Sequence, residues 1–240
     1  MGSELLMKTM VLNLSGPMQS WGVSSRFSRR STETEPSKSG VIGLLAAAQG
    51  RPRTAEVDDL AELVMAVRVD RPGQLLEDFH TARRPGAKHS VLSYRHYRAD
   101  AAYTAAVAGE DALIDALSHA VLQPEFPLYL GRRSCPAPPN LFGGVFDGVA
   151  PEYILRDLDA APWQAADDYR KSLGRTVFLP LARDAQPGEI GEAAYDVPVS
   201  FNPERRQYRV RLVVRPDPVR VENDLGAENT DPYLNLVQEA

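Results

Sequence analysis

The sequence predicts an α+β fold, with a ferredoxin-like N-terminal part and a smaller C-terminal part built mostly of antiparallel strands. Two observations lead to this prediction. In the first half, strand-like and helix-like segments follow one another in the order β-α-β, and this order repeats after a basic segment, as in the split βαβ unit. Beyond residue 131 the sequence is rich in Pro and Gly, and short strand-like runs replace the helices. The composition, 43% hydrophobic and 25% charged over 240 residues, is that of a globular chain of one or two domains.

The strands of the first half are short apolar or β-branched runs bounded by Gly and Pro. Residues 8–14 end at Gly16-Pro17, and residues 63–69 end at the turn Arg71-Pro72-Gly73. In chain order, strands are expected at residues 8–14, 63–69, 74–80, 103–107 and 126–130.

Two helices are predicted from apolar residues that recur with the helical period. The first begins after Ser37, a suitable N-cap, and stops before Gly50. The second runs from Glu110 to Leu122 and carries its apolar residues on one side.

Three later strands are expected at residues 176–180, 195–201 and 207–214. In the last of them, apolar residues alternate with Arg209 and Arg211. Because alternate residues of a strand point to opposite faces, we expect one face to be buried. The apolar set consists of Tyr208, Val210, Leu212 and Val214.

The net charge of −5 would count against a nucleic-acid-binding protein if the charges were evenly spread. Five acidic residues lie in the last twenty positions, and the chain before them has equal numbers of acidic and basic residues. The basic residues are 23 Arg and 4 Lys. Guanidinium groups suit phosphate and stack on bases, although a GC-rich gene would give the same bias.

Several classes of protein are excluded by composition. No run approaches the roughly 18 apolar residues of a membrane span, and a single Cys excludes a disulfide framework or a multi-cysteine zinc site. The four His lack metal-ligand spacing with Cys135 or with paired carboxylates. We therefore expect a cytoplasmic protein with no metal, no cofactor and no membrane contact.

The stretch from Thr81 to Ala99 holds five basic residues and no acidic one, with Tyr and His interleaved. Cations bind phosphates, and each base stacked on an aromatic ring contributes roughly 1–3 kcal/mol. We expect this stretch, as one loop or hairpin, to bind single-stranded nucleic acid. The alternative is a solvated basic loop on a metabolic enzyme.

Two further basic sites flank this stretch in the sequence. Residues 26–30 precede the helix start at Ser37–Gly40, where free amides could hold an anion, and ordinary capping is the alternative for Ser37. This is not a P-loop, because Glu33 stands where that motif requires Gly. Arg132 and Arg133 form the third site.

Evidence for catalysis is thin. There is no G-x-S-x-G motif, and His119 lies inside a predicted helix. His80, with Tyr94, Tyr97 and Lys88, could support metal-free RNA cleavage. A small-molecule enzyme that holds a phosphorylated ligand at the Ser37-Lys38 helix start is a third hypothesis.

Four motifs in order resemble the CasD family of type I-E CRISPR Cascade subunits, within the RAMP superfamily. They are the segments Leu14–Gly22, Pro36–Leu45, Asp78–Thr81 and Tyr129–Pro136. The resemblance extends from residue 8 to about residue 145 and is faint beyond it.

The resemblance implies a RAMP ferredoxin-like domain at residues 8–140 with a thumb at about 79–101, a small β-rich part at 141–220 and an acidic tail at 221–240. It implies a non-catalytic subunit that caps the 5′ repeat-derived handle of the crRNA in antiviral defence. The implied partners are the large CasA subunit, the CasC backbone subunit and, only within the assembled complex, target DNA. A metal-independent endoribonuclease that processes repeat RNA stays the alternative.

We expect no catalytic or metal-binding residue. Trp21 could instead pack in the core, and Arg132 with Arg133 could instead pair with acids of another subunit. The expected RNA-binding residues, from the basic clusters and the family motifs together, are Gln19, Trp21, Arg26, Arg29, Arg30, Ser37, Lys38, Ser39, Gly40, His80, Arg83, Arg84, Lys88, Tyr94, Arg95, Arg98, Arg132 and Arg133.

Overall fold

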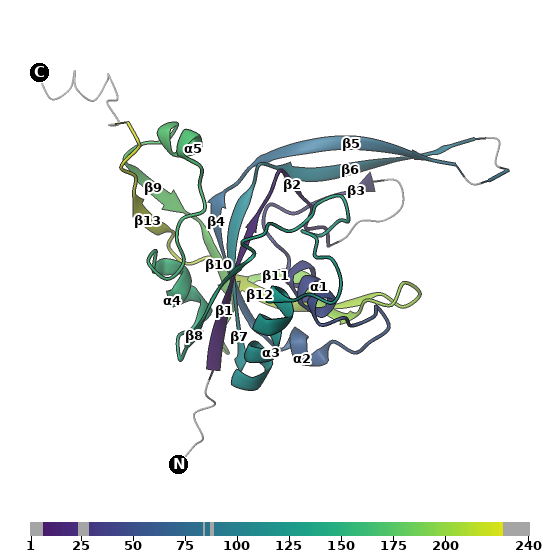
Figure 1. The fold of residues 1–240 in the computed structure, drawn as a ribbon, viewed down its shortest axis with the longest axis horizontal. Helices are drawn as coiled ribbons and strands as arrows, with labels where there is room; N and C mark the ends of the chain where they lie inside the picture. Colours follow the sequence, from purple (N-terminus) through teal and green to yellow (C-terminus); the bar gives the residue numbers. More distant parts are fainter. Residues whose placement is uncertain (1–6, 24–28, 84, 87–88, 228–240) are drawn as a thin grey trace, which may run out of the picture.

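The centre of the fold is a seven-stranded sheet in which every pair of neighbouring strands is antiparallel (Figure 1). The computed structural model describes residues 7–227 except 24–28, 84 and 87–88. The α+β class with a dominant antiparallel sheet is confirmed. In sheet order the strands are β11 (Glu192–Ser200), β12 (Gln207–Val214), β10 (Leu181–Asp184), β4 (Val64–Arg71), β7 (Ala102–Glu110), β1 (Met7–Ser15) and β8 (Phe142–Asp147).

Helices cover both faces of this sheet. Met10, Leu12 and Leu14 of β1 point into the main core, where they meet the buried residues of α1 (Lys38–Ala48) and α3 (Asp111–Leu122). Val11 points to the opposite face, which α4 (Pro151–Arg156) covers. The alternation of side chains along β1 therefore separates two apolar layers. The short helices are α2 (Asp58–Ala61) and α5 (Asp167–Lys171).

A second sheet projects from the first as a long hairpin (Figure 1). Strand β5 (Gln74–Ala82) pairs with one edge of β6 (Val91–Ala99). The short strands β2 (Met18–Gln19) and β3 (Arg29–Arg30) pair with the other edge of β6. A separate small sheet joins β9 (Thr176–Leu179) to β13 (Val219–Glu222).

The predicted strand at residues 126–130 is wrong. In this segment Tyr129 forms only an isolated bridge with Pro136, and Pro124 and Pro127 lack the N–H that a sheet ladder needs. The strand beside β1 is β8, in the Pro- and Gly-rich segment where no strand was expected before residue 176. A Cβ on Gly143 would come within 2.8 Å of Val11 Cγ1, so glycine permits the close approach of the two strands.

The expected burial of the apolar face of residues 207–214 is also wrong. Val210 and Leu212 are 43% and 41% exposed, whereas Val213 is buried. Helices α1 and α2 pack against β11 on the arginine side of this hairpin. The alternation in the sequence divides the residues of β12 correctly between two faces. The face that carries Arg211, and not the apolar one, packs against the body of the protein.

The Arg211 side chain is only 13% exposed, and two carboxylates receive its guanidinium. It donates to Asp196 at 2.7 and 2.9 Å and to Asp184 at 2.5 Å. Burial disfavours the charged guanidinium, but the hydrogen bonds to Asp196 and the attraction of both carboxylates outweigh it and raise the pKa of Arg211. Lys38 completes the cluster, since its Nζ lies 3.0 Å from Asp184 and its backbone N–H donates to Asp196 at 2.6 Å. The cluster joins β10, β11 and β12 to the start of α1.

No helix in the described part of the chain combines the length and the apolar character that crossing a membrane requires.

Replacing Asp196 by Ala should destabilise the protein by about 3–5 kcal/mol, because Arg211 would stay buried with one partner lost and the α1 amide would lose its acceptor. Urea unfolding measures this loss. Glu192→Ala, on the same strand but 73% exposed, should cost less than about 1 kcal/mol. Equal losses in the two variants would show that the buried cluster does not hold these strands.

Candidate nucleic-acid interface

The β5–β6 hairpin has two different faces. Residues opposite each other in an antiparallel register share a face, and the faces alternate along the strand. We call one the Tyr94 face, on which Phe79 lies opposite Tyr94 and Glu77 opposite His96. The other is the Tyr97 face, on which Leu76 lies opposite Tyr97 and Asp78 opposite Arg95.

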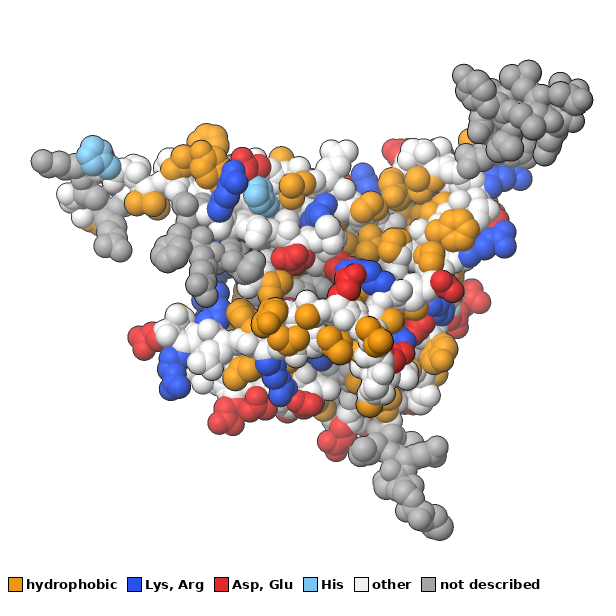
Figure 2. Space-filling model, turned by 180° about the vertical axis from the view of Figure 1, so that it is seen from behind, with side chains coloured by type: hydrophobic (Ala, Val, Ile, Leu, Met, Phe, Trp, Pro, Cys, Tyr) orange, Lys and Arg blue, Asp and Glu red, His pale blue; other side chains and the backbone are white. Residues whose placement is uncertain are grey.

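The Tyr94 face offers exposed rings beside a cation. Phe79 is 66% exposed, and the guanidinium of Arg29 lies 5.8 Å from the centre of the Tyr94 ring. Glu77 lies 2.6 Å from His96 Nε2 and 3.9 Å from Arg29. Hydrophobic side chains are visible along the hairpin arm in Figure 2, at the upper left. Exposed rings of this kind provide stacking surfaces for unpaired bases.

The Tyr97 face brings two arginines together without a carboxylate. Arg30 lies directly opposite Arg95 in the parallel register of β3 and β6. Asp78 lies opposite Arg95 on β5, but its carboxylate lies 2.8 Å from His80 Nε2. Within the described ranges, no carboxylate is within ion-pair distance of Arg30 or Arg95, and the buried Nε of Arg95 has no hydrogen-bond partner. Like charges placed opposite each other destabilise a sheet.

Arg132 fixes the base of the hairpin to the loop that follows α3. Its guanidinium donates to the carbonyls of His96 and Arg30 at 3.0 and 2.8 Å and stacks 4.6 Å from the centre of the Tyr97 ring. The Arg132 guanidinium therefore donates its hydrogen bonds to backbone carbonyls of β3 and β6. The neighbouring Arg133 is exposed.

Gln19 and Trp21 lie inside the protein. Gln19 donates to the carbonyls of Leu14 and Ala101, each at 2.8 Å, and accepts from Trp21 Nε1 at 3.0 Å. Trp21 is 1% exposed and packs so closely on α1 that a Cβ on Gly40 would meet its ring at 2.7 Å. The structure supports the core-packing alternative for Trp21. Gln19 ties β2 back to the end of β1, and Trp21 packs the chain that follows β2 against α1.

The start of α1 already holds an anion. The carboxylate of Asp196 accepts from the Lys38 backbone N–H, and Asp184 binds the Lys38 side chain. Ser37 caps the helix by accepting from the Gly40 N–H, while Ser39 is buried beside it. The structure supports the capping alternative for Ser37. The Lys38 and Gly40 amides and the Lys38 ammonium of this helix start are already bonded within the protein.

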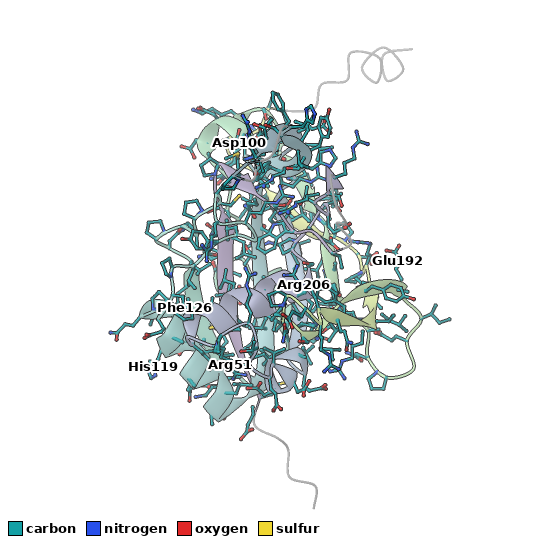
Figure 3. All side chains as sticks on the ribbon, turned by 90° about the vertical axis from the view of Figure 1, so that its right-hand side faces the viewer. Arg51, Asp100, His119, Phe126, Glu192 and Arg206 are labelled. Carbon is teal, nitrogen blue, oxygen red and sulfur yellow. The ribbon has the colours of Figure 1, made fainter. Side chains whose placement is uncertain are left out.

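The remaining predicted residues differ in position. Arg83 is exposed near the tip of the hairpin, and Arg98 lies on β6, where its Nε donates to Glu33 O at 3.3 Å. Arg26, Arg84 and Lys88 lie outside the described residues. His119 belongs to α3, and Figure 3 labels it far from Asp100, which marks the end of the body from which the hairpin projects. The structure thus gathers Arg29, Arg30, His80, Tyr94 and Arg95 on one arm.

Sequence reasoning did not select Phe79 as a site residue, although it lies within the third family motif. The sequence feature that could have identified Phe79 is a large aromatic residue between two polar ones, Asp78 and His80. The strand that carries it has no buried residue. Within the ranges that the structure describes, no group of three or more His, Cys, Asp or Glu side chains could hold a metal ion.

Comparison with known proteins gives consistent matches. A family model of CRISPR-associated Cas5 proteins matches residues 9–214. The CRISPR system Cascade subunit CasD of Escherichia coli strain K12 is 34% identical over 171 residues, which are 62% of this chain and 76% of that protein. A chain of a solved CRISPR RNA-guided surveillance complex is 34% identical, with a TM-score of 0.74 over 96% of this chain and 98% of its own. A crystal structure of a Cas protein is 35% identical, with a TM-score of 0.60 over 92% and 98%.

Cys135, the single cysteine, should report the packing of the loop beside Arg132. It is 1% exposed, and burial raises the pKa of its thiol, so little reactive thiolate forms near neutral pH. We expect an alkylating reagent to modify the folded chain more than about a hundredfold more slowly than the urea-unfolded chain, since reaction needs local opening. A matched control carries the thiol at the exposed neighbouring position, through Ser134→Cys with Cys135→Ser. Equal rates at the two positions would contradict the packing of this loop.

Proposed function

The chain belongs to the CRISPR-associated Cas5 family and is a CasD-type subunit of a CRISPR surveillance complex, and from this premise we propose that it binds the crRNA and caps its 5′ repeat-derived handle. The observation that carries the proposal is the Arg30–Arg95 pair on the projecting hairpin. Two opposed guanidinium groups without a carboxylate cost stability unless an anion lies between them. An RNA phosphate supplies that anion through charge-assisted hydrogen bonds from the guanidinium groups.

The aromatic side chains supply the second half of the RNA contact. Phosphate contacts fix the position of a strand, and stacking holds its unpaired bases. Tyr94 and Phe79 lie opposite each other on the Tyr94 face, and Arg29 stacks on Tyr94. The Arg30–Arg95 pair lies on the other face of the hairpin. The hairpin can thus bind the backbone of a single strand on one side and its bases on the other.

We assign the β5–β6 hairpin, whose strands span residues 74–99, as the thumb expected at about residues 79–101, and the N-terminal part as ferredoxin-like. The chain order β1-α1-β4-β7-α3-β8 and the sheet order β4-β7-β1-β8 support the second assignment. Strands from both sides of residue 140 share the large sheet, and a domain boundary there stays a prediction.

Contacts with other proteins belong to the same proposal. We assign CasA and CasC as neighbours in the complex, with target DNA bound only there, in the cytoplasm. Exposed apolar side chains on the hairpin and on the outward face of β11 and β12 support protein contacts, because isolated subunits rarely expose such groups together. The E. coli relative is named as a Cascade subunit.

We propose that the subunit is non-catalytic. The described residues of the nuclease hypothesis are not gathered at one point, since His80 and Tyr94 lie on opposite faces of the hairpin and Tyr97 is buried. One contact favours the alternative. His80 Nε2 lies 2.8 Å from Asp78, and a carboxylate beside His is an arrangement that general acid–base catalysis uses.

Replacing Arg95 by Gln in the assembled complex should weaken retention of handle-bearing RNA about tenfold and lower the salt slope by about one, because one phosphate contact is lost. The isolated variant should be as stable as the parent protein or slightly more so, since the opposed Arg30 loses a like-charged neighbour. Filter binding across a salt series and urea unfolding measure the two effects. Arg205→Gln, on the exposed turn between β11 and β12, is the matched control. Equal loss in both variants would argue against the hairpin as the RNA site.

Purified protein incubated with repeat RNA in excess chelator should give no specific product. Loss of a specific product in the His80→Ala variant would instead establish the endoribonuclease. Gel analysis of end-labelled RNA distinguishes these results, and Arg205→Ala controls for contaminating ribonucleases, which it would not change.

A further inference from the structure

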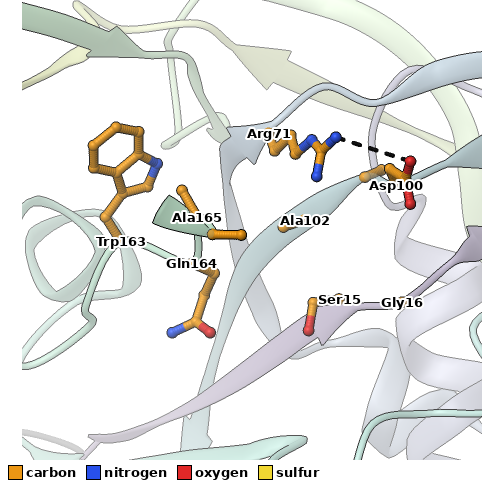
Figure 4. Close-up of a pocket in the computed structure, with 10 residues that line it drawn as sticks. Ser15, Gly16, Arg71, Asp100, Ala102, Trp163, Gln164 and Ala165 are labelled. Atoms are coloured by element: carbon orange, nitrogen blue, oxygen red, sulfur yellow. Dashed lines mark ion pairs between the residues drawn. The ribbon is translucent and has the colours of Figure 1, made fainter. Parts of the chain in front are cut away.

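A cavity of about 410 Å³ opens at the root of the hairpin (Figure 4). Ser15 and Gly16 at the end of β1, Arg71 at the end of β4 and the β6–β7 turn at Asp100 form one side of it. Residues 163–166, which lead into α5, form the other side. The volume lies within the range of ligand-binding pockets.

Arg71 provides a cation that the protein itself uses weakly. Its guanidinium lies 3.9 Å from the Asp100 carboxylate, beyond hydrogen-bond distance, and 5.0 Å from the centre of the Tyr169 ring. No hydrogen bond to this guanidinium comes from the part of the chain that the structure describes. Its planar donor fork is therefore held in place by the ring and is available to an anion.

The opposite wall is rigid because a buried ion pair holds it. Arg68 and Asp70 are both fully buried and lie 2.6 Å apart. Two of their other hydrogen bonds reach the wall: Arg68 donates to Pro162 O, and Asp70 accepts from the Gln164 N–H at 3.1 Å. The Trp163 indole N–H donates to the carbonyl of Asp70 at 2.9 Å. A buried ion pair contributes little net stability, but this one orders three successive residues at the cavity.

The polar groups in the cavity are few and of mixed character. Besides Arg71, the lining offers the Ser15 hydroxyl, the Gln164 side-chain amide and the Asp100 carboxylate, and its other surfaces include four alanines. Asp100 has φ of +54°, the one positive φ of a non-glycine residue among those described. Backbone strain of this kind concentrates at binding sites.

We propose that this cavity holds one unstacked nucleotide of the bound RNA, with its phosphate on Arg71 and its base against the alanine-lined wall. A free anion would need more than one cation, and a cationic ligand would not be placed beside Arg71. A nucleotide combines one negative charge with a flat, neutral base whose edge can bond to Gln164 and Asp100. The proposal rests on the proposed function, and it adds a base-binding site that the basic residues of the hairpin do not form.

The test uses the full complex assembled on crRNA with photoreactive thio-bases at successive handle positions. After irradiation and trypsin digestion, mass spectrometry identifies the crosslinked peptides. Residues 157–170 form one tryptic peptide that carries the cavity wall, and residues 89–95 form another that carries Tyr94. We expect one RNA position to crosslink to 157–170, and Arg71→Ala to reduce that yield about tenfold.

Two further variants keep the test independent of folding. Gln164→Ala removes a side-chain amide from the lining together with its local hydrogen bond to Pro162 O, but it keeps the backbone N–H that bonds to Asp70. This variant should also reduce the 157–170 crosslink while the 89–95 crosslink persists. Arg53→Ala removes an exposed arginine from the turn after α1 and should change neither. A reduction in Arg53→Ala equal to that in Arg71→Ala would overturn the proposal.

The outcomes separate this inference from the proposed function. Crosslinks at 89–95 without any at 157–170 would overturn the nucleotide site and leave the RNA-binding hairpin intact. Absence of crosslinks at both peptides would count against the proposed function as well. Attachment of 157–170 to a peptide of another subunit, detected with a protein crosslinker, together with no RNA adduct there, would show that the cavity receives a protein side chain instead.

Discussion

The position of three strands of the large sheet depends on one buried cluster of charges. Asp184 and Asp196 lie on neighbouring parts of the sheet, and Arg211 from β12 bonds to both. Lys38 then joins the same carboxylates to the first turn of α1, which packs on the central strands. Each charge would be costly alone, because burial removes its hydration. The four are tolerable only together, so β10, β11, β12 and α1 have one relative arrangement. That arrangement also turns the apolar side of β12 outward.

The central strands are linked to the hairpin by continuity of the chain. Strand β4 continues through the turn at Gly73 into β5, and β6 returns through Asp100 into β7. A Cβ on Gly73 would clash with the carbonyl of Ala99, so the β4–β5 turn and the β6–β7 turn pack directly on each other. Gln19 bonds to Ala101 and Arg132 to His96, which adds support at the same level. The direction of the hairpin is therefore set by its root rather than by contacts along its length.

How much of this could be read from the sequence depends on the range of the interactions involved. The helix at Lys38–Ala48 was predictable because its cap and its period are local, and Ser37 caps it as expected. Strand β8 was missed because its glycines suggest a loop, whereas contact with Val11 explains Gly143 and a positive φ explains Gly144. The inward face of β12 was assigned wrongly, since the carboxylates that accept Arg211 lie 15 and 27 positions away. The basic and aromatic residues of the hairpin were recognisable from composition, but their division between two faces depended on a register that composition does not give.

Contacts with the body of the protein alone do not account for the stability of the hairpin, because much of the hairpin is exposed. A two-stranded ribbon is marginally stable in water, and β2 and β3 support only the part of β6 from Tyr94 to Ala99. Beyond that point β5 and β6 pair only with each other among the described strands, and Val91 and Leu92 face solvent there, as Phe79 does beside Tyr94. Burial of these side chains against RNA bases or another subunit would contribute roughly 25 cal/mol per Å². The conformational entropy lost when the arm becomes ordered would offset part of this stabilisation. If the arm binds RNA as proposed, its supported root would hold Arg30 and Arg95 in place while the part without β2 and β3 adjusts to the path of a single strand.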